Sequence, residues 1–214
     1  MNSKLFSIAG LHADEDVHLD YPVDGGGLAT LRLGTGARVR SGTIIYSGST
    51  IGDRLATGHN VVIRERCDIG DDVSVWSNSI VDYGCQIGHG VKIHSNCYIA
   101  QFTIIEDGAF LAPGISIAND LYPGTLRSAE LMTGPVIGPG AQIGAGVTIL
   151  PYVTIGAGSL IGAGSVVTTD IPPGVVAVGN PARPTKRVAD LTPLDERLLP
   201  NATARPLRDD WNRS

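Results

Sequence analysis

Aliphatic residues recur at every sixth position over most of this chain. A small or aliphatic residue stands two positions before most of them, and glycine, asparagine or aspartate often follows. The first series, interrupted only by Thr57, comprises Val39, Ile45, Ile51, Ile63, Ile69, Val75, Val81, Ile87, Ile93, Ile99, Ile105, Leu111 and Ile117. A second series, shifted in phase, comprises Ile137, Ile143, Ile149, Ile155, Ile161 and Val167.

A strict period of six fits neither an α-helix, with its period near 3.6, nor a simple strand, with its period of two. It fits very short strands joined by turns, in which residues i and i−2 face one interior. Three such strands close a triangular coil of about eighteen residues, and parallel coils stack at roughly 4.8 Å. We therefore expect an all-β fold, a parallel β-helix built as a hexapeptide-repeat solenoid. A glycine-rich sandwich, the alternative, would show longer strands at irregular spacing.

The repeat divides the chain into three parts. Residues 1–30 lack it and are expected to cap the first coil, residues 31–183 form the coils, and residues 184–214 are expected to hold a short helix and a tail. Residues 118–135 interrupt the repeat and are expected to protrude as a loop. An insertion of 14 residues would bring the turns that begin at Gly144 and Gly162 to the corner that carries His94. Insertions of two or eight residues are the arithmetic alternatives.

Composition narrows the classes of partner. A net charge of −5 and a pI near 5.4 argue against a nucleic-acid-binding protein. No apolar run is long enough for a secretion signal or a membrane span, so we expect a cytoplasmic protein without membrane contact. The three cysteines fit neither a disulfide framework nor a zinc site, and their place in the repeat predicts core packing.

Residues 18 positions apart should lie above one another in the coils. One predicted corner stacks Gly58, Trp76, His94 and Ala112, and the next position along it stacks His59, Ser77, Ser95 and Pro113. The position after that stacks Asn60, Asn78 and Asn96. Asparagine tolerates the left-handed backbone of a turn, so a purely structural ladder is one interpretation of this column. Contact with a substrate is the other.

Two groups of motifs resemble known families. The segment from Ile143 to Arg187 resembles the C-terminal coils of the acetyl-CoA-dependent hexapeptide acyltransferases, and Gly-Asn-Pro-Ala at residues 179–182 is their usual exit from the coil. TGHNVVIRE (57–65), SNCYI (95–99) and NDLYP (119–123) resemble the WxcM-like sugar N-acetyltransferases. The resemblance implies a left-handed β-helix and a homotrimer. It also implies transfer of an acetyl group from acetyl-CoA to the amine of a nucleotide-linked amino-deoxy sugar.

That reaction needs a base for the amine proton and a donor for the oxygen of the thioester. Histidine suits the proton step because its pKa lies near neutrality. His94 is the first candidate, His59 the second, and Asn96 or the Ser95 N–H could hold the oxygen. For both histidines, a hydrogen-bonded surface residue is the alternative interpretation.

Further residues are candidates for binding. The expected contacts with the acceptor are Trp76, Asn78, Asn119, Asp120 and Tyr122. The expected contacts with acetyl-CoA are Gly144, Ala145, Gly162 and Ala163 beside the pantetheine arm, and Arg183 and Lys186 near the phosphates. A solvated C-terminal face is the alternative for the two cations. The sequence departs from the family pattern at Gly124, where arginine commonly follows NDLYP, and at Trp76, where a small residue is usual.

Three other functions remain open at this stage. An O-acetyltransferase would use the same co-substrate on a sugar hydroxyl. A γ-type carbonic anhydrase would bind zinc through His59, His89 and His94. His89 and His94 fall on different predicted corners, however, so no metal site is expected. A non-catalytic solenoid subunit would need no reactive edge.

Overall fold

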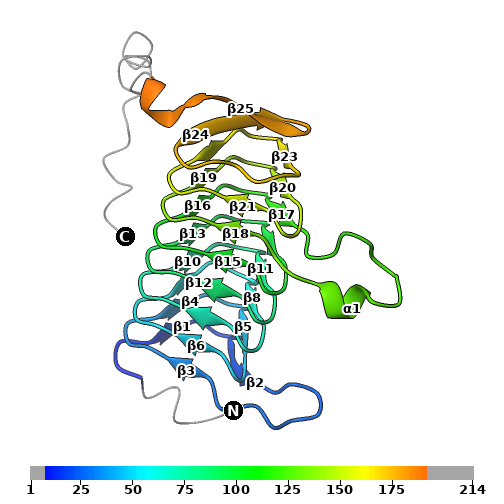
Figure 1. Ribbon diagram of the computed structural model, residues 1–214. Helices are drawn as coiled ribbons and strands as arrows, with labels where there is room; N and C mark the ends of the chain where they lie inside the picture. The colour runs from blue at the N-terminus through cyan, green and yellow to red at the C-terminus, as the bar shows by residue number, and fades with distance from the viewer. Residues whose placement is uncertain (1–7, 192–214) are drawn as a thin grey trace, which may run out of the picture.

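The computed structural model describes residues 8–191, which wind into a left-handed parallel β-helix of three sheets (Figure 1). The ten-stranded sheet contains, in order, β1 (His12–Ala13), β4 (Arg38–Val39), β7 (Ala56–Thr57), β10 (Ser74–Val75), β13 (Lys92–Ile93), β16 (Phe110–Leu111), β19 (Gln142–Ile143), β22 (Leu160–Ile161), β24 (Val175–Gly179) and β25 (Ala182–Arg187). The eight-stranded sheet contains β2 (His18–Tyr21), β5 (Ile44–Tyr46), β8 (Val62–Ile63), β11 (Ile80–Val81), β14 (Tyr98–Ile99), β17 (Ser116–Ile117), β20 (Thr148–Ile149) and β23 (Val166–Val167). The seven-stranded sheet contains β3 (Arg32–Leu33), β6 (Thr50–Ile51), β9 (Asp68–Ile69), β12 (Gln86–Ile87), β15 (Ile104–Ile105), β18 (Val136–Ile137) and β21 (Thr154–Ile155). The predicted fold class is confirmed.

Three corners join these sheets. The first corner follows the strands of the ten-stranded sheet, the second follows those of the eight-stranded sheet, and the third follows those of the seven-stranded sheet. In the regular coils, the second residue of each two-residue strand points inward and is buried, whereas the first points outward. The strict six-residue period of the sequence is therefore the period of buried positions.

The small interior residues also satisfy the corner backbone. The Ser79 hydroxyl donates to the carbonyl oxygen of His94 at 2.8 Å, and the Ser49 hydroxyl donates to that of Arg64 at 2.8 Å. The thiols of Cys67, Cys85 and Cys97 donate in the same way to corner carbonyls, at 3.1, 3.2 and 3.3 Å. No buried side-chain nitrogen or oxygen among residues 8–191 lacks a partner. A polar atom is tolerated inside the coil because each one is hydrogen-bonded.

The coils begin earlier than the predicted boundary at residue 31. Strands β1 and β2 already pair with β4 and β5, so the segment from His12 to Tyr21 is the first coil and not a cap without repeat structure. Leu19 lies beside Ile45, 26 positions later in place of the regular 18. The eight extra residues fall between β2 and β3 and shift the phase, which hides the coil from a search for an unbroken period.

The protruding loop has the length that keeps the columns aligned. Leu111 pairs with Ile143, 32 positions later in place of 18, so the loop between β17 and β18 inserts 14 residues. This confirms the register that was one of three alternatives. The loop extends away from the coils and carries a short helix, α1 (Ser128–Leu131), which the sequence pattern did not indicate (Figure 1).

The C-terminal end of the solenoid is an antiparallel hairpin. Residues 179–182, the Gly-Asn-Pro-Ala exit, connect β24 to β25, which continues through the predicted boundary at 183 to Arg187. A single 3-10 turn (Val188–Asp190) follows. The expected C-terminal helix and tail otherwise fall on residues 192–214, outside the described residues. Among the described residues, no helix has the length and apolarity that crossing a membrane requires.

The alternation of inward and outward residues predicts a contrast between neighbours. We expect Ile143→Ala to lower the free energy of unfolding by about 2–5 kcal/mol, because Ile143 is almost wholly buried and truncation leaves a cavity. The outward neighbour Gln142→Ala should change it by less than about 0.5 kcal/mol. Urea unfolding followed by circular dichroism measures both, and equal losses would contradict the assigned register.

Candidate active site

One column of residues runs along the first corner. It consists of the residue that follows each strand of the ten-stranded sheet: Arg40, Gly58, Trp76, His94, Ala112, Gly144, Gly162 and Val178. The hairpin extends the column by one strand, because Arg183 pairs with Val178. The structure therefore brings His94, the two glycine turns and Arg183 to one edge, with the turn at Ala112 lying between His94 and Gly144.

The His94 imidazole is held between two aromatic rings. It stacks on the Trp76 indole with centroids 4.8 Å apart and planes 12° apart, and the tilted Phe110 ring lies 4.9 Å away. His94 is half-buried, and no group among residues 8–191 hydrogen-bonds to its ring nitrogens. Ring packing, rather than a hydrogen-bonded partner, sets the orientation of this histidine and leaves a nitrogen available for proton transfer.

Phe110 was not among the predicted site residues. It occupies an outward strand position on β16, two residues before the column, so vertical alignment at a spacing of 18 does not associate it with His94. Two aromatic side chains can nevertheless meet across that offset, because their reach exceeds the separation of adjacent strands. An outward phenylalanine on a largely polar sheet face was the signal in the sequence.

His59 lies two coils from His94 along the same corner and has a different environment. Its side chain is exposed, and Nδ1 lies 2.9 Å from the Ser41 hydroxyl. Two coil spacings separate it from the His94 level by roughly 9–10 Å along the axis. The structure thus places the two predicted histidines on one edge but brings only His94 into the aromatic stack.

The asparagine column has the backbone geometry of a turn ladder. Asn60, Asn78 and Asn96 have φ values of 56°, 60° and 60°, which asparagine adopts more readily than most residues. The amide of Asn60 donates to that of Asn78 at 3.4 Å. Turn formation accounts for these residue types, and the side chain of Asn96 remains exposed beside His94.

The glycine turns offer less backbone than the sequence suggested. The N–H groups of Gly144 and Gly162 donate to Ile161 and Ala177, and those of Gly146 and Gly164 donate to Pro113 and Ala145. These amides are consumed in stacking the coils, so the expectation of accessible N–H groups is wrong for these four glycines. A Cβ on Gly144 would lie 2.5 Å from the Ala163 nitrogen. Close coil packing therefore requires this glycine whether or not a ligand binds.

The predicted phosphate partners lie at the C-terminal hairpin. Arg183 and Lys186 are exposed on β25, and one Arg183 guanidinium nitrogen donates to the Ala182 carbonyl at 2.8 Å. Arg187, in the same strand, is paired with Asp190 at 2.8 Å. The hairpin thus presents positive charge at the end of the column that is remote from Trp76.

The second corner contains a buried network of charges. The Arg64 guanidinium binds both oxygens of the Glu65 carboxylate, at 2.8 and 3.0 Å, and lies over the Tyr46 ring. The buried Asp82 carboxylate accepts from the Tyr98 hydroxyl at 2.7 Å and from the Gln101 amide at 2.8 Å. Each charge has partners, as buried charges require.

This network shifts the pKa values of two of its groups. Burial opposes ionisation of Glu65, but the hydrogen bonds from Arg64 and the nearby positive charge outweigh it and leave the pKa of Glu65 below its ordinary value. Burial and the hydrogen bond to Asp82 raise the pKa of Tyr98 to about 12. The corner therefore favours an ionised acid beside a protonated phenol.

The loop residues expected to bind the acceptor are engaged with the protein itself. The Asn119 amide donates to Gln101 and contacts the Met132 sulfur at 3.3 Å. The Asp120 carboxylate accepts from the Tyr122 N–H at 2.8 Å and from the Ser128 hydroxyl. Tyr122 is 71% exposed and lies on the loop, away from His94. The structure does not bring these three residues together with the His94 column.

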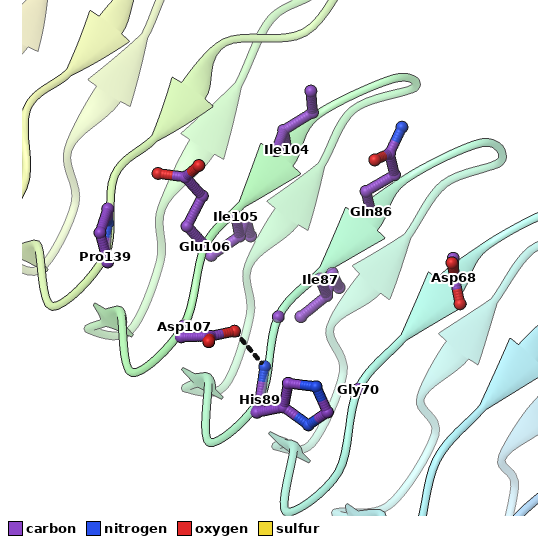
Figure 2. A pocket seen from close by; sticks show the side chains of 11 residues that line it. Asp68, Gly70, Gln86, Ile87, His89, Ile104, Ile105, Glu106, Asp107 and Pro139 are labelled. Atoms are coloured by element: carbon purple, nitrogen blue, oxygen red, sulfur yellow. Dashed lines mark hydrogen bonds between the residues drawn. The ribbon is translucent and has the colours of Figure 1, made fainter.

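An open cavity of about 470 Å³ lies on the side of the coil opposite the first corner (Figure 2). It covers the outer face of the seven-stranded sheet and the third corner, and is lined by polar residues including Asp68, Gln86 and Glu106. His89 is a rung of the third-corner ladder: its Nδ1 accepts from the Asp71 N–H at 3.0 Å, and its own N–H donates to Asp107 at 2.7 Å. This cavity contains none of the predicted site residues, and ladder geometry accounts for His89. We therefore place the candidate site at His94.

Neither a reactive thiol nor a zinc-like cluster is found among the described residues. The hydrogen bond with Cys67 and burial raise the pKa of Cys85, and burial raises that of Cys97, so the thiols stay protonated. His89 lies on the third corner and His94 on the first, and no three histidine, cysteine or acidic side chains within residues 8–191 converge on a point. The zinc ligand set of the carbonic anhydrase alternative is not assembled within this chain.

Comparison with known proteins places a familiar repeat in these coils. The family model described as bacterial transferase hexapeptide (six repeats) matches residues 134–169, which contain the turns at Gly144 and Gly162. The C-terminal coils thus carry the bacterial transferase hexapeptide repeat. No curated protein matches the chain at a significant level of similarity.

Several solved structures resemble parts of the chain. The Neisseria gonorrhoeae serine acetyltransferase (CysE) is 29% identical over 51% of this chain and 40% of its own, with a TM-score of 0.43. The Brucella abortus serine acetyltransferase in complex with coenzyme A is 26% identical over 49% of this chain and 40% of its own, with a TM-score of 0.41. LpxA from Acinetobacter baumannii is 17% identical over 85% of this chain and 74% of its own, with a TM-score of 0.41. The chain spans well under half the length of the two serine acetyltransferases.

The second-corner network predicts an alkaline effect on stability. Tyr98 stays protonated in the folded protein up to about pH 12, whereas an unfolded tyrosine ionises near pH 10. Its contribution is therefore complete below pH 10 and is lost as the pH rises from 10 to 12. Tyr98→Phe should lower the free energy of unfolding by about 1–3 kcal/mol at pH 8, because Asp82 loses a donor, and should flatten the alkaline decline. Urea unfolding at pH 8 to 11, with Tyr83→Phe as the control, measures this; unchanged stability in Tyr98→Phe would contradict the network.

Proposed function

We propose that this protein transfers an acetyl group from acetyl-CoA to the amine of a nucleotide-linked amino sugar. The observation that carries the proposal is the alignment of His94 with the turns at Gly144 and Gly162 and with Arg183 on one edge of the solenoid. The match to bacterial transferase hexapeptide repeats covers two of these turns. The resemblance of TGHNVVIRE and NDLYP to sugar N-acetyltransferases supports the amine acceptor.

His94 supplies the proton transfer in this proposal. As the acceptor nitrogen attacks the thioester carbonyl, the free nitrogen of the imidazole takes the amine proton. The tetrahedral intermediate then collapses, the carbon–sulfur bond breaks, and the imidazolium returns the proton to the leaving thiolate. The stack between Trp76 and Phe110 holds the ring in place throughout, so little reorganisation accompanies the reaction.

The oxygen of the intermediate needs a donor beside His94. The exposed amide of Asn96 and the backbone N–H of Ser95 are the nearest groups in the chain that can serve. A donor aimed at a developing oxyanion typically contributes about 10²–10³ in rate. We assign this role to the turn that follows His94.

Acetyl-CoA lies along the column in this proposal. Its thioester is at His94, its pantetheine arm passes the small residues at Gly144, Ala145, Gly162 and Ala163, and its phosphates reach Arg183 and Lys186. Five strand spacings separate the His94 and Arg183 levels, roughly 24 Å along the axis. The small turns provide room for an extended arm. They do not supply the N–H donors of Gly144 and Gly162, which the coils use.

A homotrimer completes the proposed assembly. The outward residues of β5, β8, β11 and β14 are Ile44, Val62, Ile80 and Tyr98, which form an apolar stripe on the eight-stranded sheet. Association of three copies would bury such a stripe, and the sites would then lie between neighbouring subunits. The sequence resemblance supports this arrangement.

The acceptor class can be tested directly. Release of free thiol from acetyl-CoA is measured with a panel of nucleotide-linked aminohexoses, with the matching hydroxyl sugars and with serine. We expect turnover with an amino sugar and little with its hydroxyl analogue. Turnover with hydroxyl acceptors alone would replace N-acetylation by O-acetylation, and no turnover with any acceptor would contradict the proposed function.

His94→Ala should lower turnover by about 10²–10⁴, the range for a lost general base, while the mass measured by light scattering stays unchanged. His89→Ala is the matched control, since His89 lies on a different corner and should leave turnover within about twofold. Unaltered turnover in His94→Ala would remove this histidine as the base. A comparable loss in His59→Ala would assign it a share of the role.

A further inference from the structure

The Trp76 indole has one covered face and one free face. His94 covers one side at 4.8 Å, yet 44% of the tryptophan remains exposed. The next residue along the column on the other side is Gly58, which has no side chain. The aromatic stack of the first corner therefore ends at Trp76 with an empty rung beside it.

Neighbouring side chains lean away from this rung. His59 points to Ser41, with Nδ1 2.9 Å from the hydroxyl, and the Arg40 guanidinium lies 3.6 Å from the Asp14 carboxylate. Both contacts run toward the N-terminal coils. One coil spacing, roughly 4.8 Å, separates adjacent rungs, which leaves room at the Gly58 level for one more planar ring on the stack.

The stack leans over the ten-stranded sheet. Its contact with Phe110 requires this, because Phe110 points outward from that sheet. The outward residues beside the stack are Ala56 and Ser74, which are small, and Lys92, which is exposed at the level of His94. No ion pair to Lys92 is formed within residues 8–191. A shallow path of small side chains thus leads from the free face of Trp76 to an unpaired cation.

We propose that the free face of Trp76 stacks the base of a nucleotide and that Lys92 pairs with its phosphate groups. The proposal rests on the proposed function and specifies how the acceptor is recognised. A nucleobase presents the planar face that an indole stacks, and a diphosphate is the anion that a lone ammonium binds in an acidic chain. A group attached beyond the diphosphate is then delivered to the level of His94. Trp76 thereby becomes a specificity-determining residue as well as a support for the imidazole.

The experiment uses Trp76 as its own reporter. The chain has two tryptophans, so Trp211→Phe leaves Trp76 as the sole indole. UDP, uridine and inorganic pyrophosphate are titrated separately into this variant, and the fluorescence is recorded. We expect UDP to quench strongly, uridine to quench with weaker affinity, and pyrophosphate to leave the emission nearly unchanged because it cannot stack.

Isothermal titration of UDP into further variants separates the two contacts. Trp76→Ala should weaken binding about tenfold or more, the usual effect of removing a stacking platform, and Trp76→Phe should restore most of it. Lys92→Gln should weaken UDP about three- to tenfold and leave uridine unchanged. The controls are Tyr21→Ala, an exposed aromatic on the eight-stranded sheet, and Arg32→Gln, an exposed cation on the seven-stranded sheet.

The outcomes distinguish this site from the proposed reaction. Acetyl transfer to an amino sugar with no quenching by UDP, and with KM for the acceptor unchanged in Trp76→Ala, would overturn the site and keep the reaction. UDP binding that depends on Trp76 without acetyl transfer would do the reverse. If UDP has no effect and Trp76→Ala lowers the mass measured by light scattering, a second copy covers the indole and the proposal is wrong.

Discussion

The hydrogen bonds between successive coils are the constraint on which the rest of the structure depends. Each strand donates to and accepts from its neighbours one coil away, with a parallel register that repeats every 18 residues. A shift of one residue would turn every buried aliphatic side chain outward. Extra residues are therefore admitted only at corners, and only in numbers that return the chain to the same register. The eight residues before β3 and the 14 before β18 both meet that condition.

This constraint explains which parts of the structure the sequence could predict. A period of six specifies inward positions and hence the columns, so the alignment of His94 with the turns at Gly144 and Gly162 follows from counting alone. The first coil escaped because its pairs, Leu11 with Ala13 and Val17 with Leu19, precede an insertion that breaks the count. They do carry the i, i+2 pattern at a spacing of six, and a search that allows phase shifts would find them.

Side-chain contacts between columns were beyond the reach of the count. Vertical alignment predicts that Trp76 lies over His94, but the contact of His94 with Phe110 depends on the directions in which the two rings point. The roles of Asn119 and Asp120 were missed for a related reason. Their hydrogen bonds go to Gln101, Met132 and Ser128, which become neighbours only through the path of the loop. A chain segment without periodicity leaves no register from which such partners can be deduced.

The two polar corners illustrate opposite uses of the same scaffold. At the second corner, Glu65 and Asp82 are buried, and the network that satisfies them continues through Gln101 to the base of the loop. Removing one partner from such a network leaves an uncompensated charge, so the corner is rigid. At the first corner, rings and small residues replace charges, and the surface stays open to solvent. A reaction between two bound substrates requires the second kind of corner.

The use of the glycine amides in coil stacking also bears on the proposed assembly. Because the N–H groups of Gly144 and Gly162 are bonded to the next coil, one chain offers an extended amide arm space but few donors along this column. An amide carried into such a groove without partners would lose the hydrogen bonds it makes in water. A second copy of the chain facing the column could supply them. A site shared between subunits is therefore more favourable for acetyl-CoA than a site on one solenoid alone, which gives the proposed trimer a chemical reason beyond the burial of the apolar stripe.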